Sequence, residues 1–596
     1  MKAYAGKILR VNLTTGEIKK ENLDPEIAAK FIGGRGLGTY ILSKEIDPKI
    51  DALSKENKII FVTGPLTAAP VPTGGRFMVV TKSPLSGTVA CSNSGGYWGA
   101  ELKMAGYDAV IVEGKSEKPV FLTIEDDKVE LKDASYLWGK LVGETTDILE
   151  SESAPKSKVL TIGPAGEKLS EIAAVMNDRY RAAGRSGVGA VMGSKNFKAI
   201  VVKGSGKVEI ANEEELKIVN KKWMQKLKDD GITGTGLPAY GTAVLVNIIN
   251  ESGVFPVKNF QDAHLDDVEQ ISGETLSDNY LVRKDPCYRC PIACGRYCKT
   301  DDIEGGGPEY ETVWAYSANC GVNDLKAVIK ANYWCNEYGL DTISAGCTIA
   351  AAMELHQKGI IKDEELEGNP LEFGNTDSIV DWTIKMGKRE GLGKKLSMGS
   401  YRFCDSYGHP EISMSVKKLE IPAYDPRGIQ GMGLQYATSN RGGCHVRGYL
   451  IAPEILAHPE AIDRFSLDGK ATWAKIFQDL TATIDSLGLC LFTSFACGAD
   501  DYAELINAAA GTNHDINSIL ESGDRIWNME KLFNLESGIL PGEDKLPKRL
   551  LEEEIPSGPS KGWKHKLNEL LPLYYKERGW NKEGIPTKEK LKELGL

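Results

Sequence analysis

The sequence lacks three features that would direct a protein to a membrane, to nucleic acid or out of the cell. No apolar run approaches the ~20 residues that a membrane-spanning helix requires, so no membrane span is expected. The net charge of −11 disfavours nucleic acid or an anionic lipid surface as a partner, because both select basic proteins. The N-terminal residues are typical of a strand and lack the charged and apolar regions of a secretion signal. We therefore expect a cytoplasmic protein.

The twelve cysteines do not suggest a disulfide framework, because the chain is long and carries no signal peptide. Three of them, Cys287, Cys290 and Cys294, are crowded in a proline-flanked segment with the spacing C-x2-C-x3-C. Crowded thiols are typical of a metal site, and this spacing favours an iron–sulfur cube over zinc. The spacing leaves the fourth ligand open between nearby Cys298 and a remote residue such as Cys490.

A chain of 596 residues needs several hydrophobic cores, at roughly 150 residues per domain. Residues 1–208 contain short β-branched runs bounded by glycine and proline, which predict a strand-rich domain. Helical periodicity dominates afterwards, and a break near 417–426 divides this part into 209–416 and 417–596. We therefore predict an α+β protein with an N-terminal β-rich domain, two mainly α-helical domains and no long internal repeat. The clearest strands are predicted at 58–63, 76–81, 109–113, 120–124 and 199–202, and the clearest helices at 324–338, 343–358 and 472–486.

Three glycine-rich turns in the first domain lie close to arginines. The turns cover residues 33–38, 92–96 and 181–189, and the arginines are Arg35, Arg76, Arg181 and Arg185. Phosphate oxygens are favoured both by the backbone N–H groups of such turns and by guanidinium groups. We predict a phosphate-binding cradle. The alternative is that these arginines are solvated or paired with carboxylates.

One short pattern occurs twice in the helical part of the chain. Its copies are Asn336-Glu-Tyr-Gly339-Leu340-Asp341 and Asp485-Ser-Leu-Gly488-Leu489-Cys490. Each stands where a helix ends in glycine and another segment begins, and the free N–H groups of such a junction can hold an anion or a polar ring edge. Two copies predict a ligand with two similar halves. The alternative is a pair of ordinary glycine-capped helix ends.

Two residues are candidates for acid–base chemistry. Glu311 lies in a glycine- and aromatic-rich segment, and His445 follows the pair Gly442-Gly443. A carboxylate close to apolar surface has a raised pKa and can carry a proton. The alternatives are an exposed glutamate and a hydrogen-bonded core histidine, which are the commoner situations for these residue types.

Taken together, the ordered motifs resemble the aldehyde:ferredoxin oxidoreductase family of tungsten–pterin enzymes. The resemblance runs essentially from end to end. It rests on the segments 6–16, 64–67, 72–76, 93–96, 176–178, 181–185, 237–242, 258–260, 307–311, 424–427, 441–445 and 485–490. The resemblance implies that the β-rich domain forms a base and that the two helical domains close over it, with the cofactor buried between all three.

The resemblance also implies the cofactors and their ligands. These are tungsten or molybdenum on two pyranopterins, a 4Fe–4S cluster, and Mg²⁺ held by the backbone carbonyls of Asn93 and Ala182. Pterin contacts are implied at Arg76, Asn93, Gly95, Arg181, Ala182, Gly184, Arg185, Asn336, Gly339, Leu340, Asp341, Arg447, Asp485, Gly488 and Leu489. Cluster ligands are implied at Cys287, Cys290, Cys294 and Cys490, which leaves Cys298 out. Each copy of the repeated pattern would hold one pterin. Both family copies begin with Asp, so we expect Asn336 to change the hydrogen bonding but not to abolish binding.

A second departure from the family pattern concerns assembly. Some members hold an iron between two subunits with an E-x-x-H motif, whereas the equivalent segment here, Lys330-Ala-Asn-Tyr333, has neither ligand. No iron-bridged homodimer is therefore expected, although another oligomer is open. The tail 561–596 has nine Lys or Arg against five Glu and could help to dock an acidic ferredoxin or an iron–sulfur subunit. The alternative is a solvated helix face.

The activity implied is the oxidation of small aldehydes to carboxylic acids with water as the oxygen source. Electrons would pass through the cluster to ferredoxin or a partner redox subunit, and the reverse acid reduction would also be accessible. Glu311 is expected to accept the proton, and His445 to donate a hydrogen bond to an oxygen of the metal or of the substrate. One rival is a sugar-phosphate- or formaldehyde-specific relative. Another is a non-catalytic iron–sulfur electron-transfer subunit, which would have no use for Arg76, Arg181 or Glu311.

Overall fold

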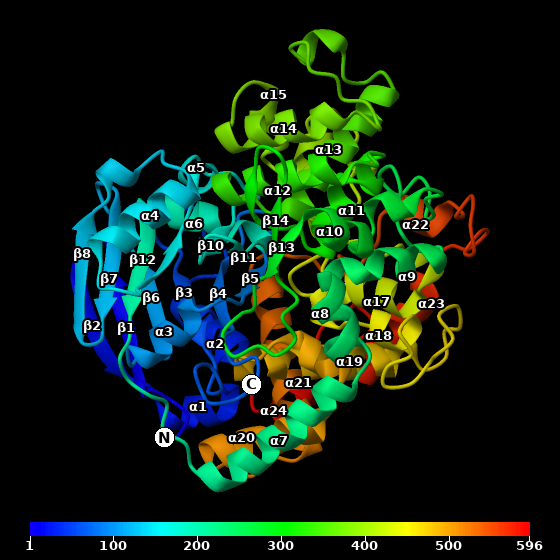
Figure 1. Cartoon of the computed structure of the whole chain (residues 1–596). Helices are drawn as coiled ribbons and strands as arrows, with labels where there is room; N and C mark the ends of the chain where they lie inside the picture. The colour runs from blue at the N-terminus through cyan, green and yellow to red at the C-terminus, as the bar shows by residue number, and fades with distance from the viewer.

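Two six-stranded sheets occupy the N-terminal third of the chain in the computed structural model, which describes residues 1–596 (Figure 1). The first has the order β2-β1-β6-β3-β4-β5, with β1 (Lys7–Asn12), β2 (Glu17–Asn22), β3 (Ile59–Thr63), β4 (Phe77–Lys82), β5 (Val89–Ser94) and β6 (Ala109–Glu113). The second has the order β11-β10-β9-β12-β7-β8, with β7 (Val120–Glu125), β8 (Lys128–Asp133), β9 (Lys158–Thr161), β10 (Val175–Asn177), β11 (Arg181–Ala183) and β12 (Phe197–Lys203). All five predicted strands are confirmed.

The second sheet repeats the topology of the first, strand for strand. In each, a hairpin (β1–β2 or β7–β8) pairs in parallel with the last strand (β6 or β12). That last strand then pairs antiparallel with a three-stranded meander, β3-β4-β5 or β9-β10-β11. The prediction of no long repeat is therefore wrong for the fold. The sequence retains only short traces of this repeat. One is a Gly-Pro pair, which follows β3 directly and follows β9 after one residue.

The sheets are covered on their faces, which explains why their central strands are apolar throughout. Every residue of β3 and β4 is buried. Helix α2 (Gly34–Glu45) packs on them so closely that a side chain at Gly38 would collide with Val62 and Val80. Two further helices, α3 (Trp98–Met104) and α6 (Val188–Ser194), precede the last strand of each repeat. Strands buried on both faces lose the alternating pattern of a half-exposed strand.

Helices dominate the rest of the chain (Figure 1). The main ones are α7 (Glu213–Asp229), α10 (Gly273–Tyr280), α11 (Tyr310–Tyr316), α12 (Leu325–Tyr338), α13 (Thr342–Gln357), α14 (Thr376–Lys388), α17 (Gln430–Thr438), α19 (Lys470–Leu487), α20 (Ala499–Ala510), α21 (Ile516–Glu536) and α23 (Leu567–Arg578). The three predicted helices are confirmed as α12, α13 and α19. A small sheet of β13 (Leu281–Lys284), β14 (Arg296–Lys299) and β15 (Glu304–Gly306) carries the cysteine loop.

The predicted α+β class is confirmed, whereas the division of the helical part stays a prediction. The largest hydrophobic cluster contains 46 buried residues and draws on both sides of the predicted boundary at 416/417. For example, Trp314 and Trp527 both belong to it. Residues on both sides of that boundary thus share one core, which contributes Tyr310, Tyr424 and Tyr449 to the site described below.

One helical run bears on the expectation that the chain has no membrane span. Residues Ile232–Glu251 are long and apolar enough to cross a membrane, with a mean hydropathy of 1.3. The run joins several short helices and includes Pro238. Of its most apolar stretch of 18 residues, 44% is buried inside the protein. Helices in the core of a protein can be equally long and apolar, so this run is not a clear membrane span.

Candidate active site

Four cysteines from distant parts of the chain surround one small cavity, here called the thiol cage. Cys287, Cys290 and Cys294 come from the loop between β13 and β14, and Cys490 follows the end of α19. None of the twelve cysteines forms a disulfide. Cys298 is buried in β14 and does not line the cage. Cys490 is therefore the thiol in position to complete the set.

Burial and one neighbouring arginine set the charge balance of the thiol cage. Burial raises the pKa of Cys290 to about 12 and also raises that of Cys294, so both thiols give up a proton only to a strong partner such as a metal. Arg76 Nη2 donates to Cys490 Sγ at 3.1 Å. Burial opposes the charge on Arg76, but the neighbouring Cys490 and Cys287 raise its pKa. Four free thiols with no imidazole or carboxylate among them fit a 4Fe–4S cluster.

A larger cavity of about 310 Å³ adjoins the thiol cage and shares Arg76, Cys287 and Cys294 with it. The other predicted site residues that line it are Gly95, Arg181, Ala182, Gly184, Glu311, Asn336, Leu340, Asp341 and His445. Aromatic side chains, including Tyr424, Tyr449 and Phe492, complete the wall. The cavity therefore has a cationic, glycine-rich side next to the cage and an aromatic side around Glu311 and His445.

The first copy of the repeated pattern faces this cavity. Gly339 ends α12 with a φ of 71°, a left-handed conformation in which glycine is the favoured residue. Asp341 then caps α13 by accepting from Ile343 N at 3.2 Å. Its other oxygen lies 3.0 Å from Arg185 Nε. Asn336 lines the cavity directly, which leaves its amide available to a bound group.

The second copy is held in a denser set of ion pairs. Asp485 accepts from Arg447 at 2.6 Å and from Arg35 at 3.4 Å through one oxygen. Its second oxygen accepts from Asn93 Nδ2 at 3.2 Å. Asn93 Oδ1 in turn accepts from Arg76 at 3.0 Å. Because Arg76 also donates to Cys490, these contacts connect the second copy directly to the thiol cage.

Each of the two sheets contacts one copy of the pattern at an equivalent glycine, and this contact position is here called a seat. Gly64 follows β3 and lies against Gly488, and Gly163 follows β9 and lies against Gly339. A side chain at Gly64 would overlap the Leu487 carbonyl, and one at Gly163 would overlap the Tyr338 carbonyl. The two seats occupy corresponding places in the two repeats. This arrangement fits the predicted ligand with two similar halves, such as a pair of pterins.

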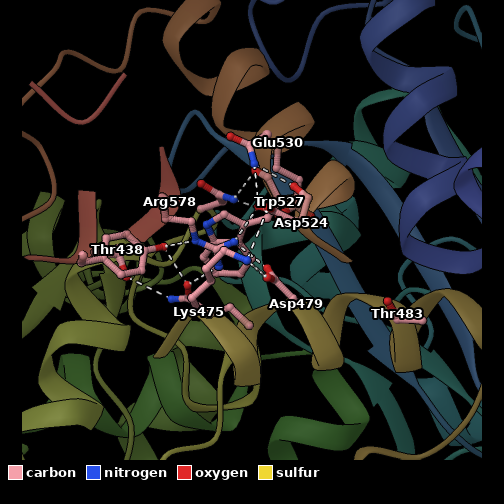
Figure 2. A network of polar contacts seen from close by, with 12 residues as sticks. Thr438, Lys475, Asp479, Thr483, Asp524, Trp527, Glu530 and Arg578 are labelled. Atoms are coloured by element: carbon pink, nitrogen blue, oxygen red, sulfur yellow. Dashed lines mark hydrogen bonds and ion pairs between the residues drawn. The ribbon is translucent and has the colours of Figure 1, made fainter. Parts of the chain in front are cut away.

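Helix α19, which ends in the second pattern, is anchored by a buried charge network. Figure 2 shows Arg578 of α23 reaching between Asp479 of α19 and Asp524 of α21, at 2.5 and 2.9 Å. Lys475 pairs with the same two carboxylates. Glu530, labelled in the same figure, forms a bidentate ion pair with Arg35, and both N–O distances are 2.7 Å. The C-terminal tail therefore stabilises the second pattern through Arg578.

Glu311 and His445 meet on the aromatic side of the cavity. Glu311 Oε1 lies 3.6 Å from His445 Nε2. Glu311 Oε2 accepts from Ala423 N at 3.0 Å. Burial raises the pKa of Glu311 to about 8, while burial and the charges of Arg185 and Arg441 hold the pKa of His445 well below its usual value. Glu311 Oε1 and His445 Nδ1 are buried without a hydrogen-bond partner, so both are available to a substrate.

The two predicted carbonyl ligands of Mg²⁺ lie on corresponding edge strands. Asn93 belongs to β5 and Ala182 to β11, and each strand ends its sheet on the meander side. These strands pack against one another across the pseudo-symmetric base. The magnesium site stays a prediction. Its placement agrees with a cation shared between the two repeats.

Sequence reasoning missed charged groups that border the site. Arg441 Nη2 donates to Cys444 Sγ at 2.8 Å. Burial alone would raise the pKa of this thiol, but the charges of Arg441 and Arg447 lower it below its usual value. Glu420 accepts from Ser344 Oγ at 2.6 Å and lies near Arg185. The sequence segment Arg441-Gly-Gly-Cys-His445 could have indicated the pair of Arg441 with Cys444. Glu420 has no local signal, because its partners are remote in sequence.

A cavity with a cationic, glycine-rich wall beside four thiols fits the class of redox enzymes that hold an anionic organic cofactor next to an iron–sulfur cluster. The sequence matches the family descriptions "Aldehyde ferredoxin oxidoreductase, N-terminal domain" over residues 8–204 and "Aldehyde ferredoxin oxidoreductase, domains 2 & 3" over 218–596. The chain therefore belongs to the aldehyde ferredoxin oxidoreductase family, as the motif resemblance predicted.

Individual relatives agree along the whole chain. It is 56% identical to the tungsten-containing aldehyde ferredoxin oxidoreductase of Pyrococcus furiosus, over 99% of this chain and 98% of that protein. The protein of the same name from Thermococcus kodakarensis is 54% identical over the same shares. A similar solved structure is the active site complex BamBC of benzoyl coenzyme A reductase with 1,5-dienoyl-CoA, with a TM-score of 0.85 and 27% identity. That likeness covers 100% of this chain and 97% of the other.

Proposed function

We propose that this protein is a tungsten-dependent oxidoreductase that converts an aldehyde and water into a carboxylic acid and passes the electrons to ferredoxin. Relatives at 54–56% identity over nearly the whole chain are named tungsten-containing aldehyde ferredoxin oxidoreductases. The observation that carries the proposal is that the cavity and the thiol cage share Arg76, Cys287 and Cys294. A substrate oxidised in the cavity is therefore next to the exit for its electrons.

The reaction balances as RCHO + H₂O → RCOOH + 2 H⁺ + 2 e⁻, with one electron going to each of two ferredoxins. When bound, the tungsten–pterin would supply two-electron redox chemistry, and Cys287, Cys290, Cys294 and Cys490 would hold a cluster that supplies one-electron transfer. The two repeated patterns and Arg76, Arg181 and Arg185 would hold the pterins. Molybdenum is the alternative metal, since the protein contacts pterins rather than the metal.

Glu311 and His445 handle the proton and the substrate oxygen. Glu311 has a pKa of about 8 and so exchanges protons near neutral pH, as a general base must. It accepts the proton of the attacking water through Oε1. His445 is neutral because its pKa is lowered, and it donates one ring N–H to the carbonyl oxygen. Burial of the pair strengthens both interactions and limits competing water.

The rival functions have less support. A non-catalytic electron-transfer subunit gives no reason for the Glu311–His445 pair or for the duplicated seats. A sugar-phosphate-specific relative would need a cation on the substrate side, whereas Tyr424 and Tyr449 lie beside His445 on that side. We propose a small aldehyde without a phosphate group as substrate.

The organisation of the protein belongs to the same proposal. We place domain boundaries at 208/209, between β12 and α7, and at 416/417. We propose a cytoplasmic enzyme without an iron-bridged homodimer, since Lys330 pairs with Asp302 at 2.7 Å where that family motif would lie. Ferredoxin or an iron–sulfur subunit is the electron acceptor.

The test is aldehyde-dependent reduction of ferredoxin by the protein purified without oxygen after growth with tungstate. We expect one carboxylate for every two ferredoxins reduced, with its new oxygen derived from isotopically labelled water. Reduction without carboxylate formation, or carboxylate without the solvent label, would contradict the proposal.

A further inference from the structure

The outer wall of the thiol cage is a surface groove. Cys287 and Cys290 line both the cage and this groove, so these two side chains separate the cluster site from solvent. Electron tunnelling weakens steeply with distance. The groove therefore offers a short route from the surface to the proposed cluster.

The floor of the groove is apolar and exposed. It is formed mainly by the exposed residues Pro70, Tyr97, Met224, Pro286 and Pro291, together with buried Pro72. Tyr97 is 39% exposed and Met224 is 43% exposed, high values for large hydrophobic side chains. Exposed apolar surface gathered at one place is typical of an interaction site. Its small extent suits the transient contacts of electron carriers.

Cations without an ion pair lie in the groove and on the two segments that border it, the cysteine loop and α7. Arg289 lines the groove at the tip of the cysteine loop, with a φ of 48° and its carbonyl accepting from Thr73 N at 3.0 Å. Lys284 precedes the loop and is exposed. On α7, exposed Lys221 and Lys228 lie three and four residues from Met224, on the same side of the helix.

These four cations differ from their neighbours. Arg283, beside Lys284, is neutralised by Asp285 at 2.9 Å. Lys222, beside Lys221, is paired with Glu504 at 2.7 Å. Arg289, Lys221, Lys228 and Lys284 have no such ion pair. The two segments that border the groove thus carry four unpaired cations, whereas the chain as a whole has a net charge of −11.

We infer that the groove and its four cations, together called the exit patch, form the docking surface for a small acidic iron–sulfur protein of the ferredoxin type. The inference rests on the function proposed above and adds where and by what chemistry the acceptor binds. Acidic side chains around the partner's cluster face the four cations, while the apolar floor excludes water between the two clusters. Charges of this kind act mainly on association rate and on its dependence on salt.

The C-terminal tail is the competing site, and the structure disfavours it. Several of its cations are already engaged: Arg578 is buried between two aspartates, and Lys590 pairs with Asp524 at 2.7 Å. Exposed Lys561, Lys582 and Lys588 remain in the tail. They provide a matched control, because reversing three charges there changes the net charge as much as reversing three at the exit patch.

The experiment compares the triple variant Lys221→Glu, Lys228→Glu, Lys284→Glu with the triple variant Lys561→Glu, Lys582→Glu, Lys588→Glu. A recombinant acidic 4Fe–4S ferredoxin is titrated against each oxidised holoprotein at low and high salt. The same ferredoxin then serves as acceptor in aldehyde turnover. For the exit-patch variant we expect at least a tenfold weaker Kd at low salt, a similarly raised KM for ferredoxin, and a flatter dependence on salt. Arg289→Gln alone should act in the same direction.

Two controls separate docking from catalysis. Reduction of benzyl viologen and the iron content should stay within twofold of the unaltered protein in both triple variants. Ferredoxin affinity unchanged in the exit-patch variant, or weakened equally in the tail variant, would overturn the docking inference. If the unaltered protein oxidised no aldehyde with any dye, the proposed function would fail, while the titration would still decide where ferredoxin binds.

Discussion

The two copies of the repeated pattern occupy equivalent seats but serve different sides of the chemistry. The first copy, at 336–341, lines the cavity and is tied through Asp341 and Arg185 to the neighbourhood of Glu311. The second, at 485–490, is held by Arg35, Arg447 and Asn93 and ends in Cys490 at the thiol cage. In the proposed function, the duplicated base therefore has a proton side and an electron side. Variants on the two sides should therefore fail in different ways.

Loss of Cys490 should have the largest effect, because it removes a ligand as well as the end of the second pattern. We expect Cys490→Ser to lose the cluster and all ferredoxin reduction, measured as iron content and electron paramagnetic resonance of the reduced protein. Cys298→Ser is the matched control and should keep both. A cluster lost from Cys298→Ser and kept in Cys490→Ser would reverse the assignment.

On the proton side, Glu311→Gln should retain iron and tungsten and lower kcat by about 10² or more. The carboxylate must be ionised to accept a proton, and its pKa is about 8, so activity should rise as pH increases through 8. This rise should be absent from the residual activity of the variant. Glu309→Gln offers a control in the same cavity, because Glu309 already accepts from Thr242 at 2.6 Å. Near-full activity of Glu311→Gln would exclude it as the proton acceptor.

The two patterns begin with different residues, Asn336 and Asp485, so an Asp-to-Asn change can be made in one and an Asn-to-Asp change in the other. Asp485→Asn leaves Arg447 and Arg35 without their shared carboxylate, and breaking a buried pair in this way costs about 3–5 kcal/mol. We expect a lower melting temperature and severalfold less bound tungsten. Unchanged values for both would show that the ion pairs around the second pattern do not hold the cofactor.

The reverse exchange, Asn336→Asp, should have the smallest effect. It restores the residue type of the second copy at a position that faces the cavity, where one hydrogen bond is worth about 1 kcal/mol. We expect unchanged tungsten and iron content and a kcat within about fivefold of the unaltered protein. Loss of tungsten from this variant would mean that the two seats are far less alike than their geometry indicates.

How much could be predicted from the sequence depended on how local the cause was. Helices α12 and α13 were predictable because Asp324 and Asp341 cap them and Gly339 ends the first. The duplicated sheets were missed, because strand order depends on long-range pairing and the two repeats have kept only scattered glycines and prolines in common. Cys490 was assigned through the family resemblance rather than through spacing. The ion pair of Arg35 with Glu530 joins residues nearly five hundred positions apart and has no local signal.

The measurement that tests the central claim most directly is elemental analysis of the intact protein, purified without oxygen after expression with both tungstate and molybdate. A base that seats two pterins beside a four-thiol cage predicts iron and tungsten in a ratio of about four to one, with molybdenum as the alternative metal. Iron in that amount with neither tungsten nor molybdenum would contradict the account and leave an electron carrier in place of an enzyme.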